Sequence, residues 1–426
     1  MKKKNQSIRG MHDFLPKDTI YLQIIEKKII KILKSHTYKE IRTPILEDTE
    51  IFKKSIGGNT DVMSKEMYSF YDRNEKNISL RPEGTVGCIR ACIQHHIFKK
   101  SLFQKLWYYG PMFRYERPQK GRFRQFYQLG IEVFGFSDPI IDFDLILLTI
   151  KIWNKLGILK DLILEINSIG SINNRKNYEN DLRIFCEKKI DKFNLDNFRN
   201  VILNNPIRLL DSKNINIILM MKNAPKLINY LDLSSQLRFQ KLCNYLDQKQ
   251  VNYIINHKLV RGLDYYNDTV FEWKSKNLGA QDTICAGGRY DQLIKNLGGP
   301  KNSAMGCAIG IDRLFLLKEL FKKKIIKNNY FIDIQIIFSN PEFYRFVLDI
   351  SDQLHTIWPK LKIDTNITKI SVSNQIKHAI QNHTKFLLIL DSYLLSSNKI
   401  IIKNISLRTQ KKEFFYRIFQ SPCIFI

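Results

Sequence analysis

A group of basic side chains lies between two segments that have the composition of β-strands, 105–116 and 125–134. The short stretch that joins them, 117–124, predicts a hairpin. An arginine on a strand is held rigidly, and its planar guanidinium can bind two phosphate oxygens together. The hairpin therefore indicates a site for a nucleotide or the end of a nucleic acid, or else a solvated charged loop. Its basic positions are Arg114, Arg117, Lys120, Arg122 and Arg124.

Two further segments combine glycine with side chains that can bind a ligand. In R-G-L-D-Y-Y, 261–266, the aspartate and the tyrosines can make directed hydrogen bonds. The alternative is an ordinary strand end, in which Arg261 pairs with a carboxylate such as Asp264. C-A-G-G-R-Y-D, 285–291, has adjacent glycines that either let a ligand approach the backbone closely or form a tight turn.

The segment 304–314, A-M-G-C-A-I-G-I-D-R-L, alternates small with larger apolar residues. On a β-strand, Gly306, Ala308 and Gly310 share one face, and that face can lie flat against a planar ring such as adenine. Arg313 follows at the start of a predicted helix, where it can reach phosphates. The G-x-G-x-x-G spacing of dinucleotide-binding folds is absent, so we do not expect a Rossmann fold.

The composition is that of a globular protein, with 44% hydrophobic residues and a net charge of +27. The charge fits a polyanionic partner, or a composition bias that spreads lysine over the surface. No apolar run is long enough for a membrane span, and the basic N-terminus continues into polar residues, so we expect neither a membrane anchor nor a secretory signal. The cysteines and histidines form no metal motif, which favours free thiols in a reducing cytosol and no protein-held metal.

Changes in composition and in the spacing of apolar residues along the chain predict its division into domains. Residues 18–36 have apolar positions at helical spacing, and 170–250 combines helical periodicity with almost no glycine. A charged stretch at 322–329 predicts a linker, after which strand and helix patterns alternate. The predicted parts are 1–167 and 257–325 for the two halves of a core, 168–256 for a helical insertion, and 326–426 for a small α/β domain.

Taken together, these segments resemble a known family. F-R-Y-E at 113–116, G-C-A-I-G-I-D-R at 306–313 and Y-K-E-I-R-T-P at 38–44 are similar to the three signature motifs of class II aminoacyl-tRNA synthetases. Within that class, R-G-L-D-Y-Y and A-G-G-R-Y-D resemble the signatures of histidyl-tRNA synthetases, and I-R-G-M-H-D-F-L-P and L-R-P-E-G-T fit as well. The resemblance covers residues 8 to about 320 closely, whereas the C-terminal domain matches in outline.

The resemblance implies an α+β fold with an antiparallel sheet flanked by helices, a helical insertion and a C-terminal α/β anticodon-binding domain. It also implies a cytoplasmic homodimer that uses ATP, with Mg²⁺ on the ATP phosphates, to convert L-histidine into histidyl-adenylate. The histidyl group would then pass to the 3′ end of tRNA-His. A site that hydrogen-bonds a polar ring rejects apolar analogues strongly, so no editing domain is expected.

The resemblance also assigns roles to individual residues. Arg261 and Arg114 are expected to be catalytic, by holding the α-phosphate from its two sides. ATP would further contact Arg313 and Gly310. The expected tRNA contacts are Arg117 and Gln119 in the hairpin loop. The residues expected to bind histidine are Glu83, Thr85, Gln128, Glu132, Tyr266 and Tyr290.

Three alternatives remain open at this point. A regulatory paralogue would keep the synthetase fold and lose catalysis, although Arg114, Arg261 and Arg313 are all present. Another class II synthetase, for glycine or proline, is disfavoured by the R-G-L-D-Y-Y segment. A protein that only binds nucleic acid would explain the charge and not the segments that resemble a ligand pocket.

Overall fold

The computed structural model describes residues 5–57, 60–193, 195, 198–212, 214–279, 281–320, 332–365, 371–391 and 396–420. The contacts within the chain divide it into two units, Met1–Lys322 and Lys323–Ile426. The linker predicted at 322–329 lies outside the described residues. No helix within the described ranges is both long and apolar enough to cross a bilayer.

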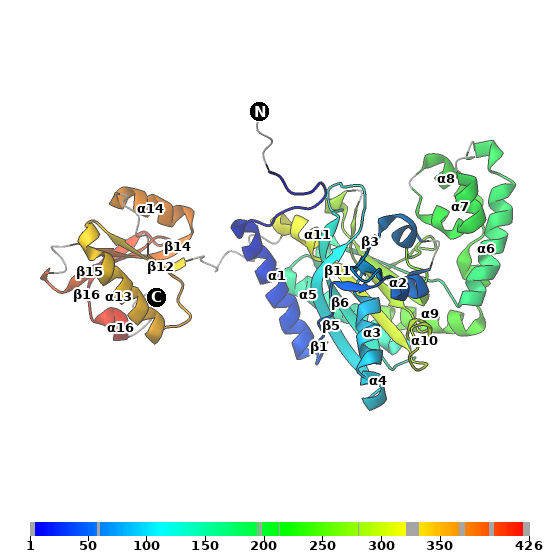
Figure 1. Ribbon diagram of the computed structural model, residues 1–426, viewed down its shortest axis with the longest axis horizontal. Helices are drawn as coiled ribbons and strands as arrows, with labels where there is room; N and C mark the ends of the chain where they lie inside the picture. The colour runs from blue at the N-terminus through cyan, green and yellow to red at the C-terminus, as the bar shows by residue number, and fades with distance from the viewer. Residues whose placement is uncertain are drawn as a thin grey trace. The chain divides into compact units, whose positions relative to one another are not determined.

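The first unit is built on an 8-stranded sheet (Figure 1). Most neighbouring strands are antiparallel, and only the two edge pairs, β1 with β5 and β7 with β8, run parallel. The predicted hairpin is present, since β5 and β6 pair along their whole length. In spatial order the strands are β1 (Lys39–Glu40), β5 (Gln104–Phe113), β6 (Gln125–Phe134), β11 (Ala304–Gly310), β10 (Thr283–Arg289), β9 (Asn267–Lys274), β7 (Ile163–Ser168) and β8 (Ile254–Ile255).

Helices flank this sheet, and their apolar spacing explains how. In α1 (Pro16–Ser35), Ile25, Ile29 and Leu33 recur every four residues and are fully buried, and the helix packs on α5 (Ile140–Leu156). The remaining helices of this part are α2 (Thr49–Ile56), α3 (Thr85–Gln94), α4 (Ile97–Lys100), α10 (Leu293–Asn296) and α11 (Ile311–Leu316).

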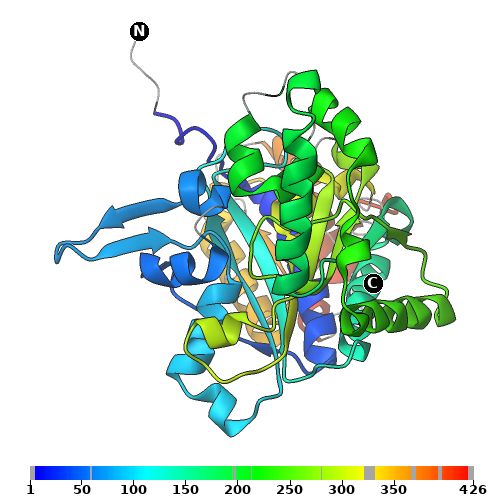
Figure 2. The same ribbon diagram turned by 90° about the vertical axis from the view of Figure 1, so that its right-hand side faces the viewer.

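A second, 3-stranded sheet in this unit has the order β2 (Leu46–Asp48), β4 (Asn77–Leu80) and β3 (Tyr68–Tyr71). The hairpin formed by β3 and β4 projects from the body of the unit in Figure 2. Phe70 and Tyr71 on this hairpin, and Leu46 on β2, are largely exposed to solvent. By the strand register, Leu46 and Phe70 lie on one face of this sheet and Tyr71 on the other. Exposed apolar side chains that gather in one place are typical of an interaction site.

The helical segment between β7 and β8 forms a module of its own, grouped to one side of the sheet in Figure 1. Its helices are α6 (Ile172–Glu187), α7 (Arg199–Asn204), α8 (Ile215–Met220) and α9 (Leu233–Gln248). Tyr178, Leu182 and Cys186 follow one another at a spacing of four along α6 and are fully buried. They belong to a cluster that also contains Val270 of β9 and Phe134 of β6, so the module is packed on the sheet.

The second unit is a small α/β domain. Its 5-stranded sheet has the order β13 (Ile363–Thr365), β12 (Ile332–Phe338), β14 (Thr384–Leu390), β15 (Lys399–Asn404) and β16 (Thr409–Phe414). One face packs on α13 (Tyr344–Ile357) and α16 (Arg417–Gln420), and the other on α14 (Val372–Gln381). The α+β architecture expected from the sequence is thereby confirmed in both units.

Candidate active site

A cavity of about 280 Å³ lies against the central sheet of the first unit. The antiparallel pairing of β6, β11 and β10 brings residues that are far apart in sequence to its wall. Gly310 lies opposite Gln128 across this pairing, and Gly306 lies opposite Glu132. The small face predicted for 304–314 borders the cavity, since Gly306, Ala308 and Gly310 all line it.

Two buried carboxylates mark one end of the site. Glu83 follows β4 and accepts hydrogen bonds from the backbone N–H groups of Thr85 and Val86, each at 2.8 Å. The Tyr265 hydroxyl donates to Glu83 Oε2 at 3.4 Å. Because Glu83 lines the cavity, its carboxylate offers an anionic partner to a ligand's cationic group. Burial raises the pKa of Glu83 above its ordinary value.

Glu132, on β6, lies just behind the cavity wall. Its Oε1 accepts from Thr85 Oγ1 at 2.8 Å and from the Tyr108 hydroxyl at 3.1 Å, and its Oε2 accepts from the Tyr290 hydroxyl. The donors line the cavity, whereas Glu132 itself does not. Glu132 therefore acts on the cavity through the hydroxyls that it orients, and a direct contact with a ligand requires one of them to move aside.

Burial raises the pKa of Glu132 to about 8, although the three hydroxyl donors oppose that shift. The carboxyl therefore changes protonation state near neutral pH. The packing around it is close: a Cβ at Gly306 would collide with Glu132 Oε2 and would lie 2.7 Å from the Tyr290 hydroxyl. The Ile131 carbonyl oxygen would also lie 2.7 Å away, so the close packing of β6 and Tyr290 against Gly306 favours glycine at that position.

Arginines dominate the rest of the wall. Arg114 follows β5, where its Nε donates to the Pro82 carbonyl at 2.9 Å and its guanidinium lies 5.3 Å from the centre of the Phe126 ring. Arg313, on α11, donates to the carbonyl oxygens of Gly121 at 2.9 Å and Thr283 at 2.8 Å. The hydrogen bonds of Arg313 thus go to neutral oxygens, which leaves its positive charge for a ligand, whereas Arg114 Nη1 also lies 4.0 Å from Glu116 Oε1.

Arg261 precedes β9 and faces the same cavity. Its Nη1 pairs with Glu272 on β9, and its guanidinium lies 5.6 Å from the centre of the Tyr266 ring. The carboxylate partner is therefore Glu272 and not Asp264, the candidate nearest in sequence. Glu272 is itself shared, because Thr283 Oγ1 donates to its other oxygen at 2.9 Å.

The structure gathers most of the residues that the resemblance assigns to the site. Those that line the cavity are Glu83, Thr85, Arg114, Gln128, Arg261, Tyr266, Tyr290, Gly310 and Arg313. Gln128 Oε1 is buried and has no hydrogen-bond partner among the described residues, so a donor on a ligand can satisfy it. Arg117 and Gln119 do not line the cavity. They are exposed on the loop between β5 and β6.

Tyr108 and Glu272 contact residues of the site and were not identified from the sequence. Tyr265 was expected to make a directed hydrogen bond, but its partner was not predicted, since the contact with Glu83 joins residues 182 positions apart. Tyr108 lies mid-strand and resembles any core tyrosine. The alternation of residues along a strand shows which side chains are buried. It does not show which buried hydroxyl bonds to a carboxylate, because the partner is on another strand.

The arrangement can bind a ligand that is cationic at one end and carries phosphates at the other. Buried carboxylates suit an ammonium or imidazole group, and fixed guanidinium groups suit charge that develops on a phosphoryl centre. Within the described ranges, no cluster of three or more His, Cys, Asp or Glu side chains has an arrangement that could hold a metal ion.

Comparisons with known proteins agree with this geometry. A family model described as histidyl-tRNA synthetase matches residues 10–314. The chain is 46% identical to the histidine–tRNA ligase of Buchnera aphidicola subsp. Schizaphis graminum, over 98% of this chain and 96% of that protein. It is also 46% identical to the histidine–tRNA ligase of Blochmanniella pennsylvanica, over 96% of this chain and 93% of that protein.

Among solved structures, the apo histidyl-tRNA synthetase of S. aureus is similar, with a TM-score of 0.78 and 30% identity, and the match covers 98% of this chain and 99% of that one. Both units are therefore included in the match. The family model covers most of the chain, and the relatives agree along nearly its full length. The chain belongs to the histidyl-tRNA synthetase family.

Proposed function

We propose that the protein activates L-histidine with ATP and transfers the histidyl group to tRNA-His. The observation that carries the proposal is the meeting of buried carboxylates, hydroxyl donors and arginines at one cavity. In the first step, the histidine carboxylate attacks the α-phosphorus of ATP and pyrophosphate leaves. In the second, the terminal 3′-hydroxyl of the tRNA attacks the carbonyl of histidyl-adenylate and AMP leaves.

The residues divide between the two ends of this reaction. Glu83 receives the ammonium group of histidine, with Thr85 and Gln128 beside it. An imidazole requires both a donor and an acceptor, and Tyr266 together with the Glu132–Tyr290 pair can supply both. The ring is thereby selected by polar contacts that an apolar side chain cannot replace.

Arginines carry the phosphoryl chemistry. Arg114 and Arg261 hold the α-phosphate, where negative charge builds up in the transition state, and Arg313 holds the distal phosphates. Adenine lies against the small face of β11 near Gly310. Mg²⁺ enters with ATP as part of the substrate and neutralises charge on its phosphates.

The RNA partner is proposed to contact both units. Arg117 and Gln119 present exposed polar side chains on the loop whose residues Gly121 and Arg122 line the cavity, which suits the acceptor end of tRNA. In the second unit, which we assign to the anticodon, the exposed rings of Phe414 and Tyr416 stack at 5.9 Å, and Lys399 Nζ lies 5.5 Å from the Phe414 ring. Exposed rings beside lysines are typical of surfaces that stack single-stranded bases.

We further propose a homodimer located in the cytoplasm. The exposed apolar residues Leu46, Phe70 and Tyr71 of the projecting sheet support a self-association surface. The described cysteines are all free, which is compatible with a reducing compartment. Sedimentation equilibrium tests the dimer.

ATP–pyrophosphate exchange, measured with each of the twenty amino acids in turn, tests the function. We expect exchange with histidine alone, followed by histidylation of tRNA-His. Exchange with a different amino acid would reassign the substrate. Absence of exchange with all of them would point to a paralogue without catalysis.

A further inference from the structure

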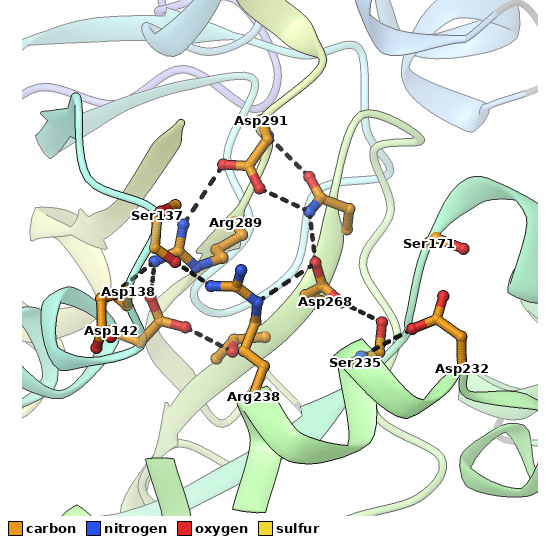
Figure 3. A network of polar contacts seen from close by, with 12 residues as sticks. Ser137, Asp138, Asp142, Ser171, Asp232, Ser235, Arg238, Asp268, Arg289 and Asp291 are labelled. Carbon is orange, nitrogen blue, oxygen red and sulfur yellow. Dashed lines mark hydrogen bonds and ion pairs between the residues drawn. The ribbon is translucent and has the colours of Figure 1, made fainter. Parts of the chain in front are cut away.

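A chain of hydrogen bonds leads from the helical module to the segments that carry the cavity tyrosines (Figure 3). Ser235, in the first turn of α9, donates through Oγ to Asp268 Oδ1 at 2.7 Å, and the two side chains face each other in Figure 3. Asp268 Oδ2 accepts from Asn267 Nδ2 at 3.0 Å. Ser235 is buried, so this bond between the module and the sheet is shielded from water.

Asn267 extends the chain to a second segment. Its Nδ2 donates to Asp291 Oδ2 at 3.1 Å, and its Oδ1 accepts from the Asp291 backbone N–H at 2.7 Å. Asn267 directly follows Tyr266 in the sequence, and Asp291 directly follows Tyr290. This pair of hydrogen bonds therefore ties together the two backbone segments from which the cavity tyrosines project.

The other side of the network is anchored in the core. Arg289 and Asp142 are both fully buried and pair at 2.7 Å, and Arg289 also reaches Asp291 Oδ1 at 3.4 Å. Thr269 Oγ1 donates to Asp142 Oδ2 at 2.7 Å. The sheet side of the network is therefore rigid, and a change on the α9 side is passed on to Asp268 and Asn267.

Asp268 itself adopts a left-handed backbone conformation, with φ at +50°, which residues other than glycine seldom do. Hydrogen bonds on both sides hold it there: its N–H donates to the Gly170 carbonyl at 3.0 Å, and its carbonyl accepts from Ile169 N–H at 2.8 Å. Asp268 is the second residue of β9, at the point where the pairing of β9 with β10 shifts register between Gly288 and Arg289, so a displacement of Asp268 moves the start of the strand that directly follows Tyr266.

We infer that Ser235 and Asp268 are positioning residues, through which the docking of α9 on the sheet sets the placement of Tyr266 and Tyr290 and thereby the affinity for the imidazole end of histidine. The inference rests on the proposed function. It gives the helical module a part in amino-acid recognition, although α9 supplies no residue that lines the cavity.

The test uses the full-length chain with Ser235→Ala, and Ser234→Ala serves as a matched control because Ser234 is exposed in the same helical turn. Loss of one hydrogen bond changes an equilibrium constant by about two- to tenfold. We therefore expect the KM for histidine in ATP–pyrophosphate exchange to rise by about that factor in Ser235→Ala. The KM for ATP should stay within about twofold, because the arginines are untouched, and Ser234→Ala should match the parent.

Asp268→Asn provides a second, independent variant. Asparagine tolerates the left-handed conformation, but an amide that accepts from Ser235 then turns its own N–H₂ towards Asn267 Nδ2, which is also a donor. We expect a rise in the KM for histidine at least as large as that of Ser235→Ala. Asp268→Asn also weakens the ion pair with Arg238 of α9, which lies 3.9 Å from Asp268 Oδ2. The double variant should still show less than the product of the two single effects, since both variants change the Ser235–Asp268 hydrogen bond.

A purely structural network predicts a different outcome. If the network is only structural, the variants should have a lower melting temperature and fewer active sites. Their KM for histidine should then equal that of Ser234→Ala. An unchanged KM for histidine in both variants would overturn the inference. A rise in the KM for ATP equal to that for histidine would overturn it too. In either case the proposed function stands as long as the parent still activates histidine. A parent chain with no histidine-dependent exchange would overturn the proposed function as well.

Discussion

Replacement of Arg261 by alanine should remove most of the activation chemistry while histidine still binds. Arg261 lines the cavity and is held against Glu272, so its guanidinium is placed before the substrates arrive. It carries a fixed positive charge at any working pH and offers a planar fork to two phosphate oxygens. Its interaction should strengthen as negative charge develops at the α-phosphorus, so the loss falls on the rate and not on substrate binding.

The magnitude follows from electrostatics. Two unit charges about 4 Å apart, in a site with an effective dielectric constant of about 20, interact by about 4 kcal/mol. That energy corresponds to about 10³ in rate. Glu272 neutralises part of the charge, which lowers the value, and removal of one preorganised donor typically costs about 10²–10³. We therefore expect adenylate formation to slow by about 10²–10³ in Arg261→Ala.

Single-turnover formation of histidyl-adenylate is the assay, with active sites counted and folding checked by thermal melts. Arg261→Lys keeps the charge without the fork and should recover no more than about tenfold of the loss. Glu272→Gln separates the ion pair from the chemistry, because it removes the negative charge but keeps a side-chain oxygen that can accept a hydrogen bond from Arg261. This control should lose stability and keep a rate within about tenfold of the parent.

The competing explanation is that Arg261 only holds the start of β9 through Glu272. In that case, Arg261→Ala and Glu272→Gln should destabilise the fold by similar amounts. Both should form adenylate at close to the parental rate per folded molecule. An Arg261→Ala rate within a few-fold of the parent would refute the reasoning.

Further predictions concern the remaining residues of the site. Tyr266→Phe should weaken histidine binding in calorimetry by about two- to tenfold, since one hydrogen bond to the ring is lost, and unchanged affinity would contradict that role. Burial raises the pKa of Glu132 from 4.5 to about 8, so the stability it contributes is present below 4.5 and is lost as the pH rises through 8. Urea melts of Glu132→Gln and the parent at about pH 5 and about pH 8 should therefore show the variant gaining relative stability at the higher pH, and a constant difference would refute the shift. Arg117→Ala combined with Gln119→Ala should slow transfer to tRNA and leave ATP–pyrophosphate exchange nearly intact; an equal fall in both would assign these residues to the first step. A chain ending near residue 325 should still bind ATP and histidine, with aminoacylation weakened through tRNA affinity, and an unaltered tRNA affinity would argue against the role of the second unit.

Local patterns in the sequence were sufficient for the main elements. The spacing of Ile25, Ile29 and Leu33 predicts α1, and the hairpin of β5 and β6 follows from two strand-like segments around a short basic loop. Five consecutive elements of the second unit, from β12 to β14, also match the alternating strand and helix patterns. These features depend on neighbours within one element, which a sequence displays directly.

The hairpin of β15 and β16 was not predicted, although it completes the sheet of the second unit. Its second strand is mostly exposed and consists largely of polar and charged residues, so it lacks the alternation that marks a half-buried strand. Thr409–Phe414 forms a strand because its backbone can pair with the free edge of β15. The residues of the segment themselves do not indicate that such an edge is present.

Within the candidate site, the motif resemblance proposed residues, and the tertiary structure decided which side chains contact one another. Motif resemblance singled out Glu132 and Tyr290, which are 158 positions apart, but only the fold shows that they bond to each other and that Glu132 lies behind the wall. Likewise, Arg261 pairs with Glu272 across a turn of backbone and not with the nearer Asp264. The physical reason is that side-chain partners are set by strand register and burial, which arise only when distant segments pair.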